Sequence, residues 1–235
     1  MPKYPLNTPT HSISTKDDIT FRPGLWSRWK MSTLYDLLVI YGTYPWLWRC
    51  RWTHPARLYR AALRPGMTVV DIGPGSGFFL NKTAPDNLDL HLLDRYTGSL
   101  TAATNRLARH RPTLHTGDAL EPLPLPESST DLVILGMVLH CLRGQNITAK
   151  AAVFDHIHTV LKKEGQGEFI GYTVLAHGVA HGLLGRLGLK VLNRRGVFAN
   201  TGDSLTDLVN ALGSRFDIEE LTVCGSVAMW RVRTR

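Results

Sequence analysis

Short apolar runs alternate with helix-periodic stretches along most of this chain. The first run, residues 67–72, follows a Pro-Gly pair and ends before Gly73, as buried parallel strands with turns at both ends do. Similar patterns predict strands at 88–93, 114–116, 131–135 and 167–174, and helices at 99–109 and 146–161. Because parallel neighbours cannot be joined by a tight turn, strands that alternate with helices predict βαβ units in one sheet.

The end of the chain departs from this alternation. Residues 204–212 are predicted to form a helix, since Ser204 and Asp207 stand in capping-box order at its start. Strand-like runs at 216–223 and 227–232 predict an antiparallel hairpin, whereas the sheet of a dinucleotide dehydrogenase normally ends with a parallel strand. The expected fold is therefore α/β, with a seven-stranded, mostly parallel Rossmann-like sheet, helices on both faces and a C-terminal antiparallel hairpin.

The N-terminal part of the chain lacks strand patterns. Residues 1–24 are rich in Pro, Ser, Thr and charge and show no periodicity, which predicts an extended or disordered lead-in. Apolar positions recur at helical spacing within 25–64, which predicts a helical cap. For 235 residues one domain is the better expectation than two, so we assign a single domain to 25–235, with a Rossmann-like core at 65–235.

Composition narrows the class of protein. With 43% hydrophobic and 20% charged residues the chain is typical of a globular protein, and no apolar run approaches the roughly 18 residues that a membrane span needs. The net charge of +8 suggests polyanions, but the basic residues cluster only weakly, so we expect a small-molecule partner and no nucleic acid. Three widely spaced cysteines and an N-terminus without a signal-peptide pattern favour the cytoplasm. The oligomeric state is not indicated.

A glycine-rich turn follows the first predicted strand. Residues 73–77 read Gly-Pro-Gly-Ser-Gly directly after Asp71 and Ile72, so the backbone can approach a ligand with its amides facing a carboxylate or phosphate. A dinucleotide fingerprint has its third glycine three residues after the second, where this chain has Phe78, which disfavours NAD. Asp94 ends the next strand, where a carboxylate accepts hydrogen bonds from ribose hydroxyls, and Asp118 occupies the same edge after the third strand.

Four segments, in this order and spacing, resemble the nucleotide-binding motifs of class I S-adenosylmethionine (SAM)-dependent methyltransferases: VVDIGPGSGFF, LLDRY, TGDAL and DLVILGMVLHCL. The resemblance extends from Met67 to the C-terminus. It implies SAM as cofactor and S-adenosylhomocysteine as product, with the glycine loop at the methionine moiety, Asp94 at the ribose and Asp118 at the adenine amino group. The expected cofactor-binding residues are Asp71, Gly73, Pro74, Gly75, Ser76, Gly77, Asp94, Arg95, Asp118, Ala119 and Gly136. For Asp71 and Asp118 a structural role in their own turns stays open.

Methyl transfer from a sulfonium is an in-line displacement, so it requires alignment above all, and a base only for a protonated acceptor. His140 follows the fourth strand and is the candidate catalytic base; a structural histidine, or one that only orients the acceptor, is the alternative. Cys141 lacks the Pro-Cys context of a nucleophile. His177 and His181 stand four apart, as metal ligands on a helix do, but no third ligand supports them, so no metal is expected.

Aromatic residues of the cap are candidates to bind the acceptor. Tyr35, Tyr41 and Trp46, together with His140, are the expected substrate-binding residues, and Tyr44 and Trp48 are further candidates for an apolar wall. The alternative is that these rings are simply core. The apolar, glycine-rich segment 176–200 is expected to form the opposite wall.

Three further segments, LHCLRG, VFDHIHTVLKKEG and NRRGVFANTGDSLTDL, resemble small stand-alone methyltransferases of bacterial and fungal secondary metabolism. This narrower resemblance implies methylation of a small, largely apolar or aromatic metabolite, above all O-methylation in natural-product biosynthesis. One alternative is nucleic-acid methylation, which the lack of an Asn/Asp-Pro-Pro-Tyr motif weakens. Another is a methyltransferase-like protein that binds SAM and directs a cyclisation or rearrangement without methyl transfer.

Overall fold

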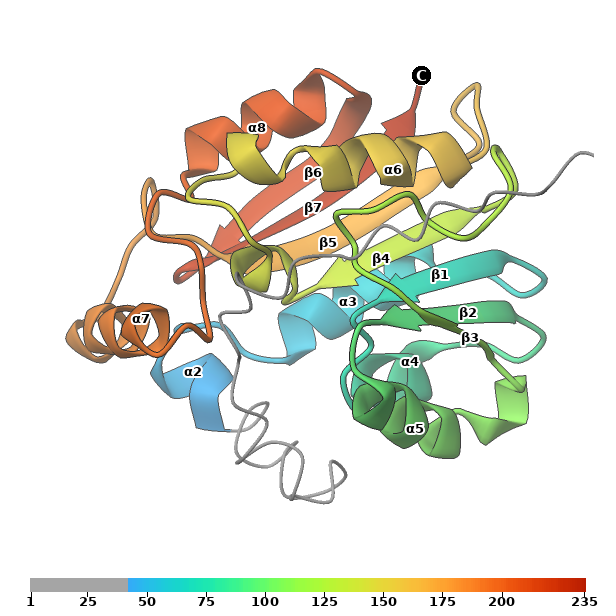
Figure 1. Ribbon diagram of the computed structural model, residues 1–235, viewed down its shortest axis with the longest axis horizontal. Coiled ribbons are helices and arrows are strands. Elements are labelled where there is room, and N and C mark those ends of the chain that lie inside the picture. The colour runs from blue at the N-terminus through green and yellow to red at the C-terminus, as the bar shows by residue number, and fades with distance from the viewer. Residues whose placement is uncertain (1–41) are drawn as a thin grey trace, which may run out of the picture.

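Seven strands form one sheet in the order β3-β2-β1-β4-β5-β7-β6 (Figure 1). The computed structural model describes residues 42–235, so the expected lead-in and residues 25–41 of the expected cap lie outside the described residues. The strands are β1 (Thr68–Ile72), β2 (Asp89–Asp94), β3 (Thr113–Thr116), β4 (Leu132–Gly136), β5 (Glu168–Val174), β6 (Phe216–Cys224) and β7 (Val227–Thr234). Strands β1 to β5 are parallel, and β7 pairs antiparallel with both β5 and β6, which confirms the expected fold.

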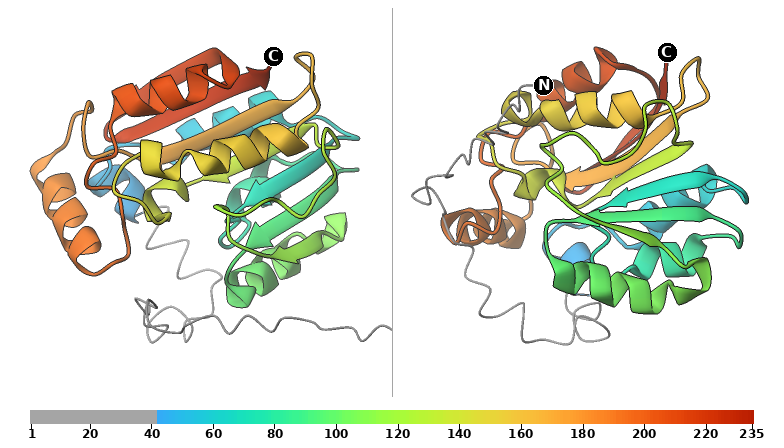
Figure 2. Two further views of the ribbon diagram at one scale, coloured as in Figure 1. Left: turned by 45° about the horizontal axis from the view of Figure 1, so that its top comes forward. Right: turned by 45° about the vertical axis from the view of Figure 1, so that its right-hand side comes forward.

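Helices cover both faces of the sheet (Figure 2). They are α2 (Tyr44–Trp46), α3 (Thr53–Ala62), α4 (Phe78–Thr83), α5 (Thr97–Arg106), α6 (Ala152–Val160), α7 (Leu183–Arg194) and α8 (Leu205–Gly213), with short 3₁₀ turns at Ala108–His110, Leu139–Cys141 and Thr148–Lys150. Side chains of α6 and α8 pack on one face in a core that includes Val133 and Leu135. Those of α3, α4 and α5 pack on the other with Leu132 and Ile134. Burial on both faces explains why the strands read as continuous apolar runs.

The helices differ from the sequence expectation in three places. The helix expected at 99–109 ends at Arg106 and continues as a 3₁₀ turn, and the one expected at 146–161 is a 3₁₀ turn followed by α6. Helix α7 lies within the segment expected only as an apolar wall. The start of α8 is as expected, since the Ser204 hydroxyl accepts a hydrogen bond from the Asp207 amide at 3.0 Å. Within residues 42–235 every helix is too short or too polar to cross a bilayer.

A buried ion pair holds together the loops beyond the carboxyl ends of the strands. Lys150 Nζ donates to both carboxylate oxygens of Asp203, at 3.0 and 2.7 Å, and both side chains are fully buried. The carbonyl oxygen of Asp203 accepts from the amides of Ala176 and His177, just after β5. Asp203, through its carboxylate and its main-chain carbonyl, therefore joins the segment after β4 to the segments on either side of α7.

We expect Asp203→Ala to lower the free energy of unfolding by about 3–5 kcal/mol, because it leaves the Lys150 ammonium buried without a partner. Denaturant titration measures this change. The double variant Lys150→Met with Asp203→Leu removes both charges, so its free energy of unfolding should fall much less. As a matched control, Asp217→Ala breaks the exposed pair with Arg235 and should cost under about 1 kcal/mol. Equal losses of unfolding free energy in the single and double variants would contradict the view that the cost comes from the unpaired Lys150 ammonium.

Candidate functional site

The predicted site residues converge because β1 pairs in parallel with strands on both sides. Ile72 lies opposite Leu93 of β2 and Leu135 of β4, so Gly73, Asp94 and Gly136 emerge next to one another at the carboxyl edge. The Gly73 amide donates to the Leu93 carbonyl at 2.8 Å, and the Gly117 amide donates to that of Asp94 at 3.2 Å. Three turns that are far apart in sequence thus line one edge.

The glycine-rich turn is shaped by left-handed backbone at Gly73, Gly75 and Gly77, with φ of +68°, +56° and +72°. A Cβ at Gly73 would collide with the Val138 side chain, so this glycine is required for packing of the turn against the segment after β4. A Cβ at Gly75 would meet no atom within 4 Å. The backbone at Gly75 therefore borders open space, and Gly77 leads directly into α4. This is the arrangement that lets amides approach a ligand.

Two residues of α5 brace this turn and were not predicted from the sequence. The Ser99 hydroxyl donates to the Gly75 carbonyl at 3.2 Å, and Arg106 Nη1 donates to the Ser76 hydroxyl at 2.8 Å. Within the turn itself, the Gly77 amide donates to the Pro74 carbonyl at 2.9 Å. Helical spacing marks α5 as a helix, but nothing local in the sequence shows that its polar side chains reach a turn more than 20 residues earlier.

Two carboxylates lie beneath the turn. Asp71 is 3% exposed, and burial, together with the negative charge of Asp94, raises its pKa to about 7. Burial also raises the pKa of Asp94, although hydrogen bonds from Ser99 and from the Tyr96 and Arg95 amides oppose the shift. Among the described residues no lysine or arginine forms an ion pair with Asp71. A cation bound near these carboxylates would stabilise the ionised form of both.

Asp118 has several protein partners. Its Oδ1 accepts from the Leu120 amide at 3.0 Å, which is an Asx turn, and its Oδ2 accepts from Arg143 at 3.1 Å and lies 3.9 Å from Arg95. The structural role that the sequence left open is thus present, while the adenine contact stays a prediction. Ala119 beside it is buried.

His140 lies in the 3₁₀ turn after β4 and is 2% exposed. Its Nδ1 is 3.1 Å from the Thr173 hydroxyl, and its ring centroid is 4.1 Å from that of Phe198. Burial and then the charge of Lys150 lower its pKa to about 3, so the imidazole is neutral at physiological pH. Thr173 and Phe198, from β5 and the segment after α7, are partners that sequence reasoning missed.

The aromatic residues expected to bind the acceptor separate into three groups. Tyr35 and Tyr41 lie outside the described residues. Tyr44 and Trp48 are 3% and 1% exposed and belong to the core, so the alternative reading is correct for them. Trp46 is 72% exposed. A further core ring, Tyr172 of β5, lies so close to Gly136 that a Cβ there would be 2.8 Å from its hydroxyl oxygen.

His177 and His181 do not stand on a helix. They lie between β5 and α7, where each Nε2 is paired with a main-chain oxygen, that of Thr201 at 2.9 Å and that of Ala176 at 3.1 Å. Within the described part of the chain no group of His, Cys, Asp and Glu is arranged to hold a metal ion.

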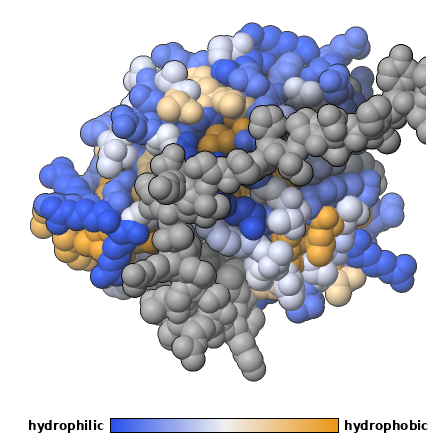
Figure 3. Space-filling view, viewed as in Figure 1, coloured by the Kyte–Doolittle hydropathy of each residue, from blue (hydrophilic) through white to orange (hydrophobic). Residues whose placement is uncertain are grey.

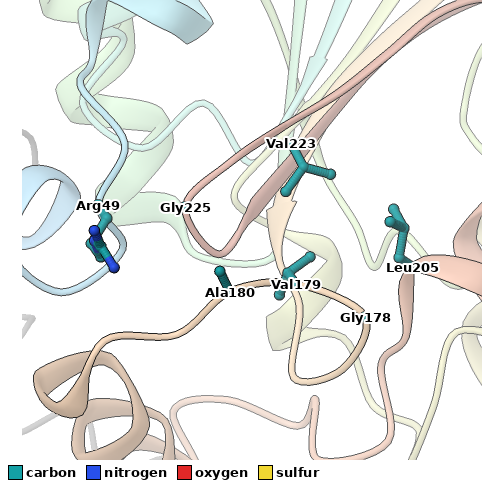
Figure 4. Close-up of a pocket in the computed structure, with 7 residues that line it drawn as sticks. All are labelled: Arg49, Gly178, Val179, Ala180, Leu205, Val223 and Gly225. Atoms are coloured by element: carbon teal, nitrogen blue, oxygen red, sulfur yellow. The ribbon is translucent and has the colours of Figure 1, made fainter.

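A solvent-open cavity of about 490 Å³ lies beside the turn of the β6–β7 hairpin (Figure 4). Its lining is mostly apolar and comprises Arg49, Gly178, Val179, Ala180, Leu205, Val223 and Gly225. The predicted cofactor-binding residues do not line it. Three of its lining residues, Gly178, Val179 and Ala180, come shortly after β5 at the carboxyl edge of the sheet. They belong to the segment 176–200, which was expected to form an acceptor wall.

Comparison with known proteins places this geometry in a family. Residues 70–168 match the model of a methyltransferase domain. The chain is 36% identical over 203 residues to demethylluteothin O-methyltransferase of Streptomyces thioluteus, covering 86% of each chain. It is 32% identical to the physcion biosynthesis cluster O-methyltransferase of Aspergillus chevalieri, covering 84% of this chain and 88% of that protein.

A solved structure shares the fold. The N-methyltransferase NodS from Bradyrhizobium japonicum WM9, in complex with S-adenosylhomocysteine, superposes with a TM-score of 0.58 at 18% identity. The match covers 77% of this chain and 84% of NodS.

We expect Asp71 to make the unliganded protein less stable as the pH rises from about 4 to 7. The folded protein binds the Asp71 proton more tightly than the unfolded chain, so stability is highest below the unfolded pKa and falls as the carboxyl ionises, by about 4 kcal/mol at most. Asp71→Asn should remove this contribution, and its unfolding free energy, measured between pH 4 and 8, should exceed that of the wild type increasingly with pH. Asp86→Asn, which changes an exposed carboxylate, serves as control and should keep the pH dependence of the wild type. If the unfolding free energies of wild type and Asp71→Asn depended equally on pH, the raised pKa of Asp71 would be contradicted.

Proposed function

The chain belongs to the S-adenosylmethionine-dependent methyltransferases, and we propose that it methylates a hydroxyl oxygen of a small, largely apolar or aromatic natural product. SAM is the methyl donor and S-adenosylhomocysteine the product. Support for the oxygen as the methylated atom comes from the two relatives above, both named O-methyltransferases, one for demethylluteothin and one from a physcion biosynthesis cluster. The free cysteines Cys50, Cys141 and Cys224 fit a reducing compartment, and we place the reaction in the cytoplasm.

The observation that carries the cofactor part of this proposal is the pair of carboxylates next to an open glycine turn. Asp71 and Asp94 both have raised pKa values and lie near the carboxyl ends of the paired strands β1 and β2, next to the 73–77 turn. A ligand that carries a sulfonium and an ammonium group relieves the repulsion between these carboxylates, whereas a pyrophosphate would increase it. The residues present therefore fit SAM and do not favour a dinucleotide.

The cofactor would be held by residues from four strand ends. We assign the amides of the 73–77 turn to the methionine moiety and the Asp94 carboxylate to the ribose hydroxyls. Asp118 and Ala119 border the adenine, while Arg95 and Gly136 complete the edge. When bound, SAM supplies an electrophilic methyl carbon, so the protein has only to align the acceptor and exclude water.

His140 is our candidate to act on the acceptor hydroxyl. Its Nδ1 is held by Thr173 and its ring by Phe198, which leaves Nε2 for a hydroxyl brought to the carboxyl edge. The low pKa keeps the imidazole neutral, the form that accepts a hydrogen bond, but makes it a weak base. We therefore propose that His140 orients the hydroxyl through Nε2 and takes its proton as the oxygen–methyl bond forms and the methyl–sulfur bond breaks, because an oxygen that has accepted a methyl group is far more acidic than an imidazolium.

The acceptor side is formed by residues before and after α7. We propose Trp46 and the apolar lining of the cavity beside Val179 and Leu205 as its outer wall. Tyr35 and Tyr41 remain proposals from the sequence alone.

We expect SAM to bind in calorimetry and NADH to give no signal. Asp94→Ala should weaken SAM binding at least about tenfold, because it removes hydrogen bonds to a charged acceptor. Asp86→Ala, which removes an exposed carboxylate, is the matched control and should bind as the wild type does. If Asp94→Ala bound SAM as tightly as the wild type, the assignment of SAM to the carboxyl edge of the sheet would be wrong.

Incubation with hydroxylated aromatic compounds and SAM should yield S-adenosylhomocysteine and a product 14 mass units heavier, about the mass of one added methylene. Conversion of an acceptor without S-adenosylhomocysteine would instead support a SAM-dependent rearrangement. Methyl incorporation into tRNA or DNA would support the nucleic-acid alternative.

His140→Ala should lower kcat by about 100-fold and leave the SAM dissociation constant unchanged. Because the imidazole is already neutral, wild-type kcat should show no loss from its protonation between pH 6 and 9. Thr173→Val removes the partner of Nδ1, keeps the ring, and should reduce kcat less. Melting temperatures measured alongside separate folding from activity; unchanged kcat in a folded His140→Ala protein would leave the residue a structural role only.

A further inference from the structure

Helix α7 presents a row of apolar side chains to solvent. Leu183 is 85% exposed, Leu184 and Leu187 are 59% exposed, and Val191 is 36% exposed. Residues 183, 187 and 191 are spaced by four and therefore lie on one side of the helix. The opposite side is the packed one, where a Cβ at Gly185 would lie 2.7 Å from the Leu47 carbonyl oxygen. An exposed apolar stripe of this kind marks an interaction surface.

A row of basic side chains runs beside the apolar row. Arg186, Lys190 and Arg194 are exposed and each follows an apolar residue by three positions, which places the two rows about 60° apart around the helix. Arg195 extends the row past the C-terminus of α7. Between Glu168 and Asp203 the sequence has no acidic residue. The apolar row is thus bordered by positive charge without any compensating negative charge from this segment.

Neighbouring residues extend this surface. Leu47 packs against Gly185 and Gly188, which brings the loop after α2 against α7, and the Arg49 side chain lies 3.4 Å from a Cβ built on Gly182. Trp46 at the end of α2 and Arg49 in this loop are exposed, and residues 42–52 contain no acidic residue. We call Trp46, Arg49 and the exposed face of α7 the α7 surface. Helix α7 projects at one end of the molecule (Figures 1 and 2), and hydrophobic side chains lie beside strongly hydrophilic ones over it (Figure 3).

We propose that the α7 surface binds the headgroup region of an anionic lipid bilayer. An amphipathic helix with leucines on one side and lysine or arginine next to them lies in the plane of the interface, with its apolar side chains among the acyl chains and its cations at the lipid phosphates. At 12 residues, α7 is about 18 Å long, which suits this position and is too short to span. The exposed indole of Trp46 is typical of the same depth.

Charge favours lipid over the other occupants of such a face. A second copy would bring the same basic row against itself, since the chain carries +8 and the row has no acidic partner. Residues 1–41 contain five basic and three acidic residues, so they too are a cationic occupant. Nucleic acid would satisfy the cations but leave three leucines and a valine in water. A surface of anionic lipid satisfies both rows at once.

Flotation with phosphatidylcholine vesicles, with and without about 30% phosphatidylserine, tests the proposal. The wild type should float with the anionic vesicles only, and less so at 0.5 M salt, where surface charges are screened. Leu183→Ser with Leu187→Ser should weaken binding at least about tenfold through lost apolar burial. Arg186→Glu with Lys190→Glu should weaken it at least as much, since each cation near such a surface contributes about fivefold.

Two matched variants serve as controls. Leu114→Ser changes an exposed leucine on β3, and Lys82→Glu reverses an exposed cation on α4; both should float like the wild type. Equal flotation of all variants, or no flotation of the wild type, would overturn the proposal. Light scattering and tRNA binding on the same samples identify the other occupants. A dimer that dissociates only in the leucine variant indicates a second copy of the chain. Binding of tRNA that is lost only in the charge variant indicates nucleic acid.

Discussion

Parallel pairing of β1 with β2 on one side and β4 on the other is the constraint on which the rest of this structure depends. It aligns the carboxyl ends of these strands, so that the residues following each of them share one edge. The same pairing buries the strands between two layers of helices, which is why Val133 and Leu135 face one core while Leu132 and Ile134 face the other. A ligand at the edge is therefore contacted by turns whose positions are set by the entire sheet.

Burial of charge gives this edge its chemical character. Asp71 is buried and Asp94 is half-buried, and the negative charge of Asp94 raises the free energy of ionising Asp71. A cationic cofactor relieves this strain, and the free energy stored in the unliganded protein becomes available for binding. Beyond β4 the buried charge that matters is positive. Lys150 forms an ion pair with Asp203, and its positive charge still disfavours protonation of His140. In the site that we propose, carboxylates face the cofactor and a neutral imidazole faces the acceptor.

The segment between β5 and α8 connects the two surfaces of the molecule. Its ends are fixed by Asp203 and by the contacts of Phe198 and Ala199 with His140, at the carboxyl edge. Its middle, α7, extends outward and presents leucines and cations to solvent. An acceptor that is itself apolar partitions into lipid, so an enzyme whose outer helix rests on a bilayer would meet its substrate there. The buried ion pair between Lys150 and Asp203 fixes the end of this segment at the carboxyl edge.

The sequence alone was enough to predict the class of fold, the positions of its strands along the chain, the glycine turn and the carboxylates at the strand ends. These follow from local patterns: an apolar run buries as a strand, and residues after parallel strands meet at one edge. The partners of His140, the bracing of the turn by Ser99 and Arg106, and the burial of Tyr44 and Trp48 became known only from the three-dimensional structure. So did the orientation of α7, whose leucine row looks like a core face in sequence. The glycine side of that helix permits a closer approach to Leu47, so the glycines pack inward and the leucines face out. Contacts between residues so distant in the chain depend on the shape of the packed surfaces, which no local pattern encodes.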